Sequence, residues 1–167
     1  MGKTSQPPKS IFIILLFFGI TFRDTGSIRI QGWNTVYRET NALFRDFSAW
    51  YHVVVAVDTT DGTADNRIKL YVNGSQITSF ATNNAYTQNA DTRINNTSLH
   101  YIGRYHSGEY LDGYLAEVNF IDGTQLTADS FGETKDGIWI PKDTSGLTFG
   151  TNGFHLTFKD DVVSEGF

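Results

Sequence analysis

The sequence predicts an all-β protein, an antiparallel β-sandwich of the jelly-roll type. Short apolar or alternating segments recur along the 167 residues, separated by turns rich in Gly and Asn. No segment keeps its apolar residues at helical spacing. Many short strands joined by tight turns are typical of sandwiches and barrels.

The clearest element is a hairpin around Asn73-Gly74, with strands over residues 68–72 and 75–80. Asn-Gly favours the two-residue turn whose twist matches that of paired strands. Period-two alternation then gives one face formed by Ile68, Leu70 and Val72, and an opposite face formed by Lys69 and Tyr71.

Residues 51–57 are apolar at successive positions, which predicts a central strand covered on both faces. Further strands are expected over 28–31, 99–103, 114–120 and 154–158, with one or two more within 33–47. Residues 81–98 are rich in Asn and Thr, which predicts a long surface loop, and Thr127 is a candidate N-cap of a short helix. The predicted core consists of Val53, Val55, Val57, Leu70, Val72, Ile102, Leu115, Val118 and Phe120.

At the N-terminus we expect residues 1–10 to be a flexible arm and residues 11–167 a single sandwich domain. Two basic residues precede an apolar run over 11–20. The run reads as a buried strand, as the apolar part of a signal segment, or as the aberrant start of a truncated reading frame, and the sequence leaves these open. It is too short to span a bilayer as a helix.

Composition excludes several classes of protein. Hydrophobic residues are 40% and aromatic residues 14% of the chain, which argues against disorder. The net charge of −5, without a basic stripe, argues against nucleic acid as a partner. The absence of cysteine rules out disulfides and thiolate metal sites.

Two blocks carry a family resemblance. The first runs from Trp50-Tyr51-His52-Val53 to Leu70-Tyr71-Val72-Asn73-Gly74, and the second joins Tyr101-Ile102-Gly103 to residues 111–118. Together they resemble the laminin-G-like and pentraxin-like branch of the concanavalin A-like lectin/glucanase superfamily, over roughly residues 47–130. Only about 45 residues precede the first block, so the resemblance implies a sandwich whose N-terminal side is shortened or rebuilt.

The downstream segments 122–142 and 150–154 resemble structural proteins of marine tailed phages. This resemblance implies a virion-associated fibre or decoration module, located on the virion or outside the cell. Its expected partners are glycans or other virion proteins, and a homo-oligomer is compatible with the sequence.

The residues selected for glycan binding are Tyr86, Tyr105, Tyr110 and Asp112. Sugar sites combine aromatic rings with a few directional polar groups, and loop residues held by a rigid sandwich suit that role. The alternative is that these tyrosines cap the sandwich or contact a neighbouring subunit.

The residues selected for a metal are Asp58, Asp61, Asp65 and Asn66, which lie within nine positions. Their hard oxygen ligands suit Ca²⁺, the one cofactor considered. The alternative, without any cofactor, is a solvated loop containing an Asp-Gly turn.

No catalytic residue is assigned. Glycosidases of the superfamily carry a Glu-x-Asp-x-x-Glu strand, which this chain lacks, and hydrolysis needs two carboxylates flanking the scissile bond. We therefore expect a non-catalytic module that binds glycan or protein. The alternatives are a purely structural subunit without ligand and, less favoured, a secreted glycoside hydrolase.

Overall fold

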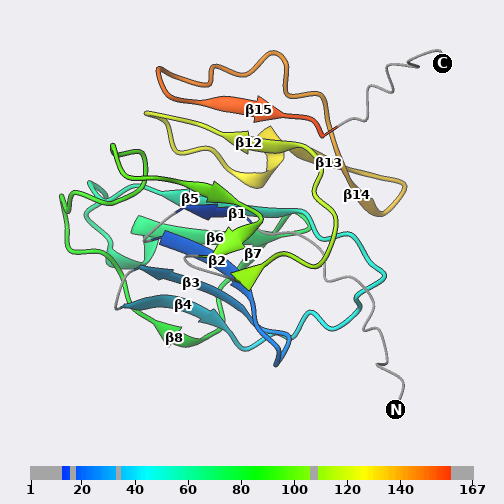
Figure 1. Ribbon diagram of the computed structural model, residues 1–167, viewed down its shortest axis with the longest axis horizontal. Coiled ribbons are helices and arrows are strands. Elements are labelled where there is room, and N and C mark those ends of the chain that lie inside the picture. Colours follow the sequence, from blue (N-terminus) through cyan, green and yellow to red (C-terminus); the bar gives the residue numbers. More distant parts are fainter. Residues whose placement is uncertain (1–12, 16–17, 33–34, 106–108, 159–167) are drawn as a thin grey trace.

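Antiparallel strands dominate this protein, as expected (Figure 1). The computed structural model describes residues 13–15, 18–32, 35–105 and 109–158. The predicted arm over residues 1–10 lies outside this part of the chain. Within it, the helical segments are two short 3-10 helices, η1 (Ala64–Arg67) and η2 (Ala128–Ser130). No helix among the described residues is long and apolar enough to cross a membrane.

Two sheets form the sandwich. The larger has the order β8 (Phe80–Asn83), β4 (Val36–Thr40), β3 (Ile28–Gly32), β2 (Phe18–Phe22), β1 (Ile13–Leu15) and β9 (Tyr101–Ile102). The smaller has the order β5 (Val53–Val57), β6 (Ile68–Val72) and β7 (Ser75–Ile77). Three two-stranded ladders complete the described chain: β10 (Arg104–Tyr105) with β11 (Glu109–Tyr110), β12 (Val118–Phe120) with β15 (Phe154–Leu156), and β13 (Gly132–Lys135) with β14 (Ile138–Pro141).

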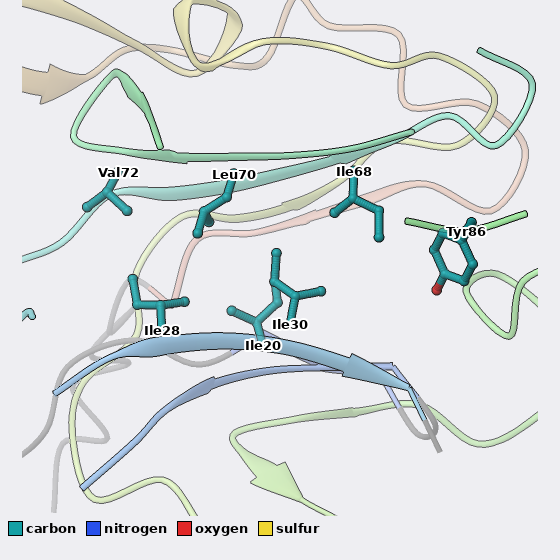
Figure 2. Close-up of a cluster of buried hydrophobic side chains, with 7 residues drawn as sticks. All are labelled: Ile20, Ile28, Ile30, Ile68, Leu70, Val72 and Tyr86. Carbon is teal, nitrogen blue, oxygen red and sulfur yellow. The ribbon is translucent and has the colours of Figure 1, made fainter. Parts of the chain in front are cut away.

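The main core lies between these two sheets, as Figure 2 shows. Ile20, Ile28 and Ile30 point inward from β2 and β3. Opposite them lie the three residues of the predicted apolar face of β6, so that prediction is confirmed. Each buried aliphatic side chain of this size contributes about 1.5–3 kcal/mol relative to exposure.

The opposite face of the smaller sheet is covered by the C-terminal part of the chain (Figure 1). Tyr71 and Ala56 are buried there with Ala128 of η2, and Trp139 of β14 packs against them. The apolar run of β5 is therefore covered on both faces, as predicted. The covering on this second face includes η2 and the β13–β14 ladder.

The Asn73-Gly74 turn has the expected geometry. Asn73 and Gly74 have φ values of 48° and 79°, and Val72 pairs with Ser75. The second strand of the hairpin, β7, ends at Ile77 and not at the predicted residue 80. Phe80 instead begins β8 in the other sheet, where it pairs with Thr40.

Several other predictions need correction. The strand β5 pairs only with β6 among the described strands, so it lies at a sheet edge, and β6 is the central strand. The strand predicted over 114–120 is reduced to β12 because Glu117 has φ 53°, which interrupts the pleat. Thr127 precedes η2, but its side chain makes no capping hydrogen bond.

Only three of the nine predicted core residues are fully buried. Leu70, Val72 and Val118 are buried, whereas the remaining predicted members are half-buried: Val53, Val55, Val57, Ile102, Leu115 and Phe120. The predicted core omitted Ile20, Ile28 and Ile30 of β2 and β3, which are buried.

The chain upstream of residue 47 supplies four of the six strands in the larger sheet. It was expected to be shortened or rebuilt. The described part of the N-terminal apolar run forms β1 and β2, which pair through Leu15 and Phe18. The run therefore contributes strands to the larger sheet, and Ile20 of β2 is buried.

Arg38 joins the two sheets from inside the sandwich. Its guanidinium donates hydrogen bonds to the carbonyls of Asn84 at 2.5 Å and of Ile68 at 3.4 Å, and lies 5.3 Å from the centroid of the Phe80 ring. Burial lowers the pKa of Arg38, while the charge of Asp65 acts in the opposite direction. A buried cation held by carbonyls and one carboxylate ties β4 to the strand β6 and to η1, which precedes it.

Candidate functional site

An exposed aromatic ring on the β10–β11 hairpin is the first candidate site. Gly103 has φ 73° before β10, and the amide of Leu111 donates to its carbonyl at 2.8 Å, which closes the hairpin base. Arg104 and Tyr110 are directly opposite each other in the ladder. The Tyr110 side chain is 71% exposed.

Arg104 holds this tyrosine next to a second one. Its guanidinium carbon lies 4.6 Å from the ring centroid of Tyr101 and 5.7 Å from that of Tyr110. A guanidinium at these distances is attracted to the faces of both rings. The result is a surface patch of two aromatic rings and one cation, here called the Arg104 platform (Tyr101, Arg104 and Tyr110).

The predicted glycan-binding residues do not all lie at this platform. Tyr110 belongs to it, and Asp112 is exposed two residues further along the chain. Tyr105 lies in β10, but its side chain is outside the described part of the structure. The sequence did not single out Arg104 or Tyr101, although a basic residue between two tyrosines in Tyr101-Ile102-Gly103-Arg104-Tyr105 was a usable signal.

Tyr86 was predicted on a surface loop, and the structure corrects this placement. Its side chain is only 9% exposed and belongs to the main core. The ring packs against Tyr37, with centroids 4.3 Å apart, and burial raises the pKa of its hydroxyl. A ring in this position is not available for stacking on a sugar.

Two of the predicted calcium ligands, Asp58 and Asp61, lie in the loop between β5 and η1, and the other two, Asp65 and Asn66, lie in η1. Asp58 Oδ1 accepts from the amide and hydroxyl of Thr60 at 2.9 and 2.7 Å, and these bonds lower the pKa of Asp58. Asp61 Oδ1 accepts from the amide of Thr63 at 2.7 Å. Both are local turns in which a carboxylate holds the backbone two residues on.

The other two predicted ligands contact other parts of the chain, Asp65 through its side chain and Asn66 through its backbone carbonyl. Asp65 Oδ1 lies 3.6 Å from the Arg38 guanidinium and 3.2 Å from the side-chain amide of Asn83. The Asn66 carbonyl accepts from Gln125 at 3.4 Å. Among the described residues, no group of three or more His, Cys, Asp or Glu side chains is placed to hold a metal ion.

A cavity of about 330 Å³ is the second candidate site. One wall is β5, and the opposite wall is the segment 116–126, which contains β12. Apolar side chains from other elements close it, among them Ile20, Ile94 and Phe131. Its volume is within the range of ligand pockets, and its lining mixes apolar side chains with polar ones such as His52, Asn95 and Gln125.

Two carboxylates line this cavity, and both have partners. Glu117 Oε2 lies 2.6 Å from His155 Nε2. Asp122 accepts from the side-chain amide of Asn95 at 2.6 Å and from the backbone amide of Asn152 at 3.1 Å. The pairing of Glu117 with His155 across the β12–β15 ladder was not anticipated from the sequence.

A profile of the concanavalin A-like lectin/glucanases superfamily, of the laminin-G-like type, matches residues 5–130. The chain belongs to this superfamily. The match covers the sandwich described above, from the N-terminal strands to η2. No curated protein and no solved structure gave a significant match.

Membership in this superfamily agrees with the fold and with a β-sandwich binding module as the general type of protein. The superfamily contains both non-catalytic laminin-G-like domains and glycosidases. The choice between these for the present chain depends on its own side chains.

Proposed function

We propose that this concanavalin A-like domain is a non-catalytic module that binds glycan at the Arg104 platform. The observation that carries the proposal is the exposed ring of Tyr110, held beside an arginine and a second tyrosine. Large aromatic rings are costly to leave in water, and sugar rings stack on them through their C–H faces. The rigid sandwich and the closed hairpin base keep the ring oriented without a ligand.

Polar groups near the ring supply direction. The Arg104 guanidinium carries N–H donors suited to hydroxyl or carboxylate oxygens of a sugar. Asp112, exposed two residues after Tyr110, offers carboxylate acceptors for sugar hydroxyls. A donor group in the platform and an acceptor group two residues further along the chain favour an acidic or neutral polysaccharide as ligand.

The proposed setting is a virion-associated fibre or decoration protein, outside the cell. The resemblance of segments 122–142 and 150–154 to structural proteins of marine tailed phages supports this setting. Fibre and decoration modules contact host surface glycans or other virion proteins, and both classes of partner fit a binding sandwich.

The absence of catalysis is part of the proposal. The two cavity carboxylates, Glu117 and Asp122, are each held by other side chains or amides of the fold. A glycosidase would need one carboxylic acid and one carboxylate facing each other across a sugar. If incubation with the bound polysaccharide releases reducing ends, the domain is a hydrolase and this part of the proposal is wrong.

Titration of the full chain against purified host surface polysaccharides, selected by a glycan array, tests the binding. Tyr110→Ala should weaken binding about tenfold, since a stacked aromatic ring contributes about 1–1.5 kcal/mol beyond simple burial. Tyr114→Ala is the matched control, because Tyr114 is also highly exposed but is not part of the platform. Both variants should melt at the wild-type temperature.

Equal loss of binding in both tyrosine variants would show that the Arg104 platform is not the glycan-binding site. Failure of the wild type to bind any polysaccharide would favour the alternative of a purely structural subunit without ligand.

A further inference from the structure

One edge of β5 carries backbone groups that no described strand pairs. At one end of the β5–β6 ladder the Asp58 amide donates to the Arg67 carbonyl at 3.1 Å. At the other end the Asn73 amide donates to the His52 carbonyl at 2.8 Å. These two bonds show that the even-numbered residues of this segment turn their backbone groups toward β6, because antiparallel pairs alternate in hydrogen bonding.

The odd-numbered residues therefore turn their N–H and C=O groups away from β6. These are Val53, Val55 and Val57, and all three line the cavity of about 330 Å³. Unpaired backbone groups in an apolar setting are costly, and a free strand edge is a template for another strand.

The opposite wall of the cavity is a second sheet edge. The strand β12 lies in it and pairs only with β15 among the described strands. The cavity thus separates two strand edges, and its lining includes the apolar residues Ile20, Ile94, Leu126 and Phe131. An extended chain fits this space better than a compact ligand, because only a strand satisfies a row of backbone groups.

The charge of the lining indicates what kind of strand fits. Glu117 and Asp122 line the cavity, and its described lining contains no lysine or arginine. The partners of Asp122 are neutral amides, so its negative charge is uncompensated by them. The two acids lie on either side of β12, Glu117 directly before it and Asp122 two residues after its end.

We propose that this cavity accepts an extended segment of a protein partner, which adds a strand to the free edge of β5. The segment has small β-branched residues at its centre and a basic residue at each end, about five positions apart. A second copy of this chain is a poorer occupant, because the chain carries a net charge of −5 and repels itself. The proposal is independent of glycan binding at the Arg104 platform.

The probe is a fluorescently labelled, acetylated peptide of sequence Lys-Val-Thr-Val-Thr-Lys, titrated against the full chain by fluorescence anisotropy. We expect saturable binding. A peptide N-methylated at its central threonine and valine should bind at least tenfold more weakly, because one of these two adjacent N–H groups must face β5. A peptide with Glu in place of both Lys should also bind at least tenfold more weakly.

A protein variant tests the same edge. Val55→Pro removes an N–H that points away from β6, so the β5–β6 ladder keeps its hydrogen bonds, and proline is tolerated at strand edges in that orientation. This variant should lose peptide binding. Tyr110→Ala should keep it, which separates this site from the glycan site.

Unchanged affinity of the N-methylated peptide would show that strand addition is not the mode of binding, and this comparison does not depend on how well the proline variant folds. Absence of binding by the unmodified peptide would also overturn the proposal. If the unliganded chain forms dimers in sedimentation experiments and the peptide dissociates them, the cavity binds a second copy of the chain instead.

Discussion

The indole ring of Trp139 lies directly over Gly74, so that a Cβ atom at Gly74 would overlap the six-membered ring. The two residues belong to different hairpins, since Gly74 closes the β6–β7 turn and Trp139 lies in β14. Trp139 also packs beside Ala56 and Tyr71 on the outer face of the smaller sheet. The turn glycine is therefore required twice, once for its positive φ and once for the space it leaves to the indole.

Gly74→Ala should destabilise the domain more than Gly137→Ala. Both glycines follow Asn or Asp in a two-residue turn and both have φ 79°, but nothing lies within 4 Å of a Cβ at Gly137. Backbone strain should cost each variant about 1 kcal/mol, and overpacking against Trp139 should add about 1–3 kcal/mol at Gly74. Urea denaturation measures both values. Equal midpoints for the two variants would show that Trp139 does not depend on this glycine.

Leu70→Ala should lower the free energy of unfolding by about 2–5 kcal/mol, because the side chain is fully buried between the two sheets and its removal leaves a cavity. Leu99→Ala is the control, since Leu99 is 70% exposed, and its effect should stay within about 0.5 kcal/mol. Chemical denaturation of both variants tests the location of the core. A small effect at Leu70 would contradict the sandwich packing.

The Arg29–Glu39 pair predicts a stability contribution that is lost in acid. Arg29 and Glu39 are opposite each other on β3 and β4, with Arg29 Nη2 2.7 Å from Glu39 Oε2, and the Ser27 hydroxyl donates to the other oxygen at 3.0 Å. Burial by itself raises the pKa of Glu39, but the hydrogen bonds from Ser27 and Arg29 and the nearby positive charges hold it below its ordinary value of 4.5. The unfolded state therefore takes up the proton first as the pH falls.

It follows that this stabilisation is complete above about pH 4.5 and disappears as the pH falls through the lower folded-state pKa. Glu39→Gln should cost about 0.5–1 kcal/mol at pH 7, as expected for a half-buried cross-strand pair, and almost nothing near pH 2. Urea titrations at both pH values measure this difference. Glu133→Gln, at an exposed position of β13, is the control. A constant cost of the Glu39 substitution at both pH values would contradict the role of the ion pair.

Calcium should leave the melting temperature unchanged. Asp58 and Asp61 use their side chains to hold local turns, and Asp65 lies beside the buried guanidinium of Arg38. Melting curves in Ca²⁺ and in EDTA should therefore coincide. If the melting temperature rises with free Ca²⁺, the native protein binds the ion, contrary to this prediction. Loss of that rise in Asp61→Asn would then show that Asp61 is a calcium ligand.

Local features of this fold could be predicted from the sequence. The Asn73-Gly74 turn depends on two residues that tolerate positive φ, and the inward face of β6 depends on simple alternation. The general class of fold follows from many such local signals. Tyr110 was identifiable as a candidate because it lies in a short polar and aromatic hairpin, where rings are exposed.

Other features depended on contacts between distant parts of the chain. Tyr86 lies in a polar segment, yet it is buried because Tyr37 of β4 provides a surface for its ring. The apolar residues 51–57 indicated a central strand, but β5 lies at an edge because no described strand pairs with its far side. Residue patterns report which faces avoid water, whereas the choice of neighbouring strand depends on the packing of the whole sandwich. The cavity beside β5 and the pairing of Glu117 with His155 depend on this packing, so only the tertiary structure revealed them.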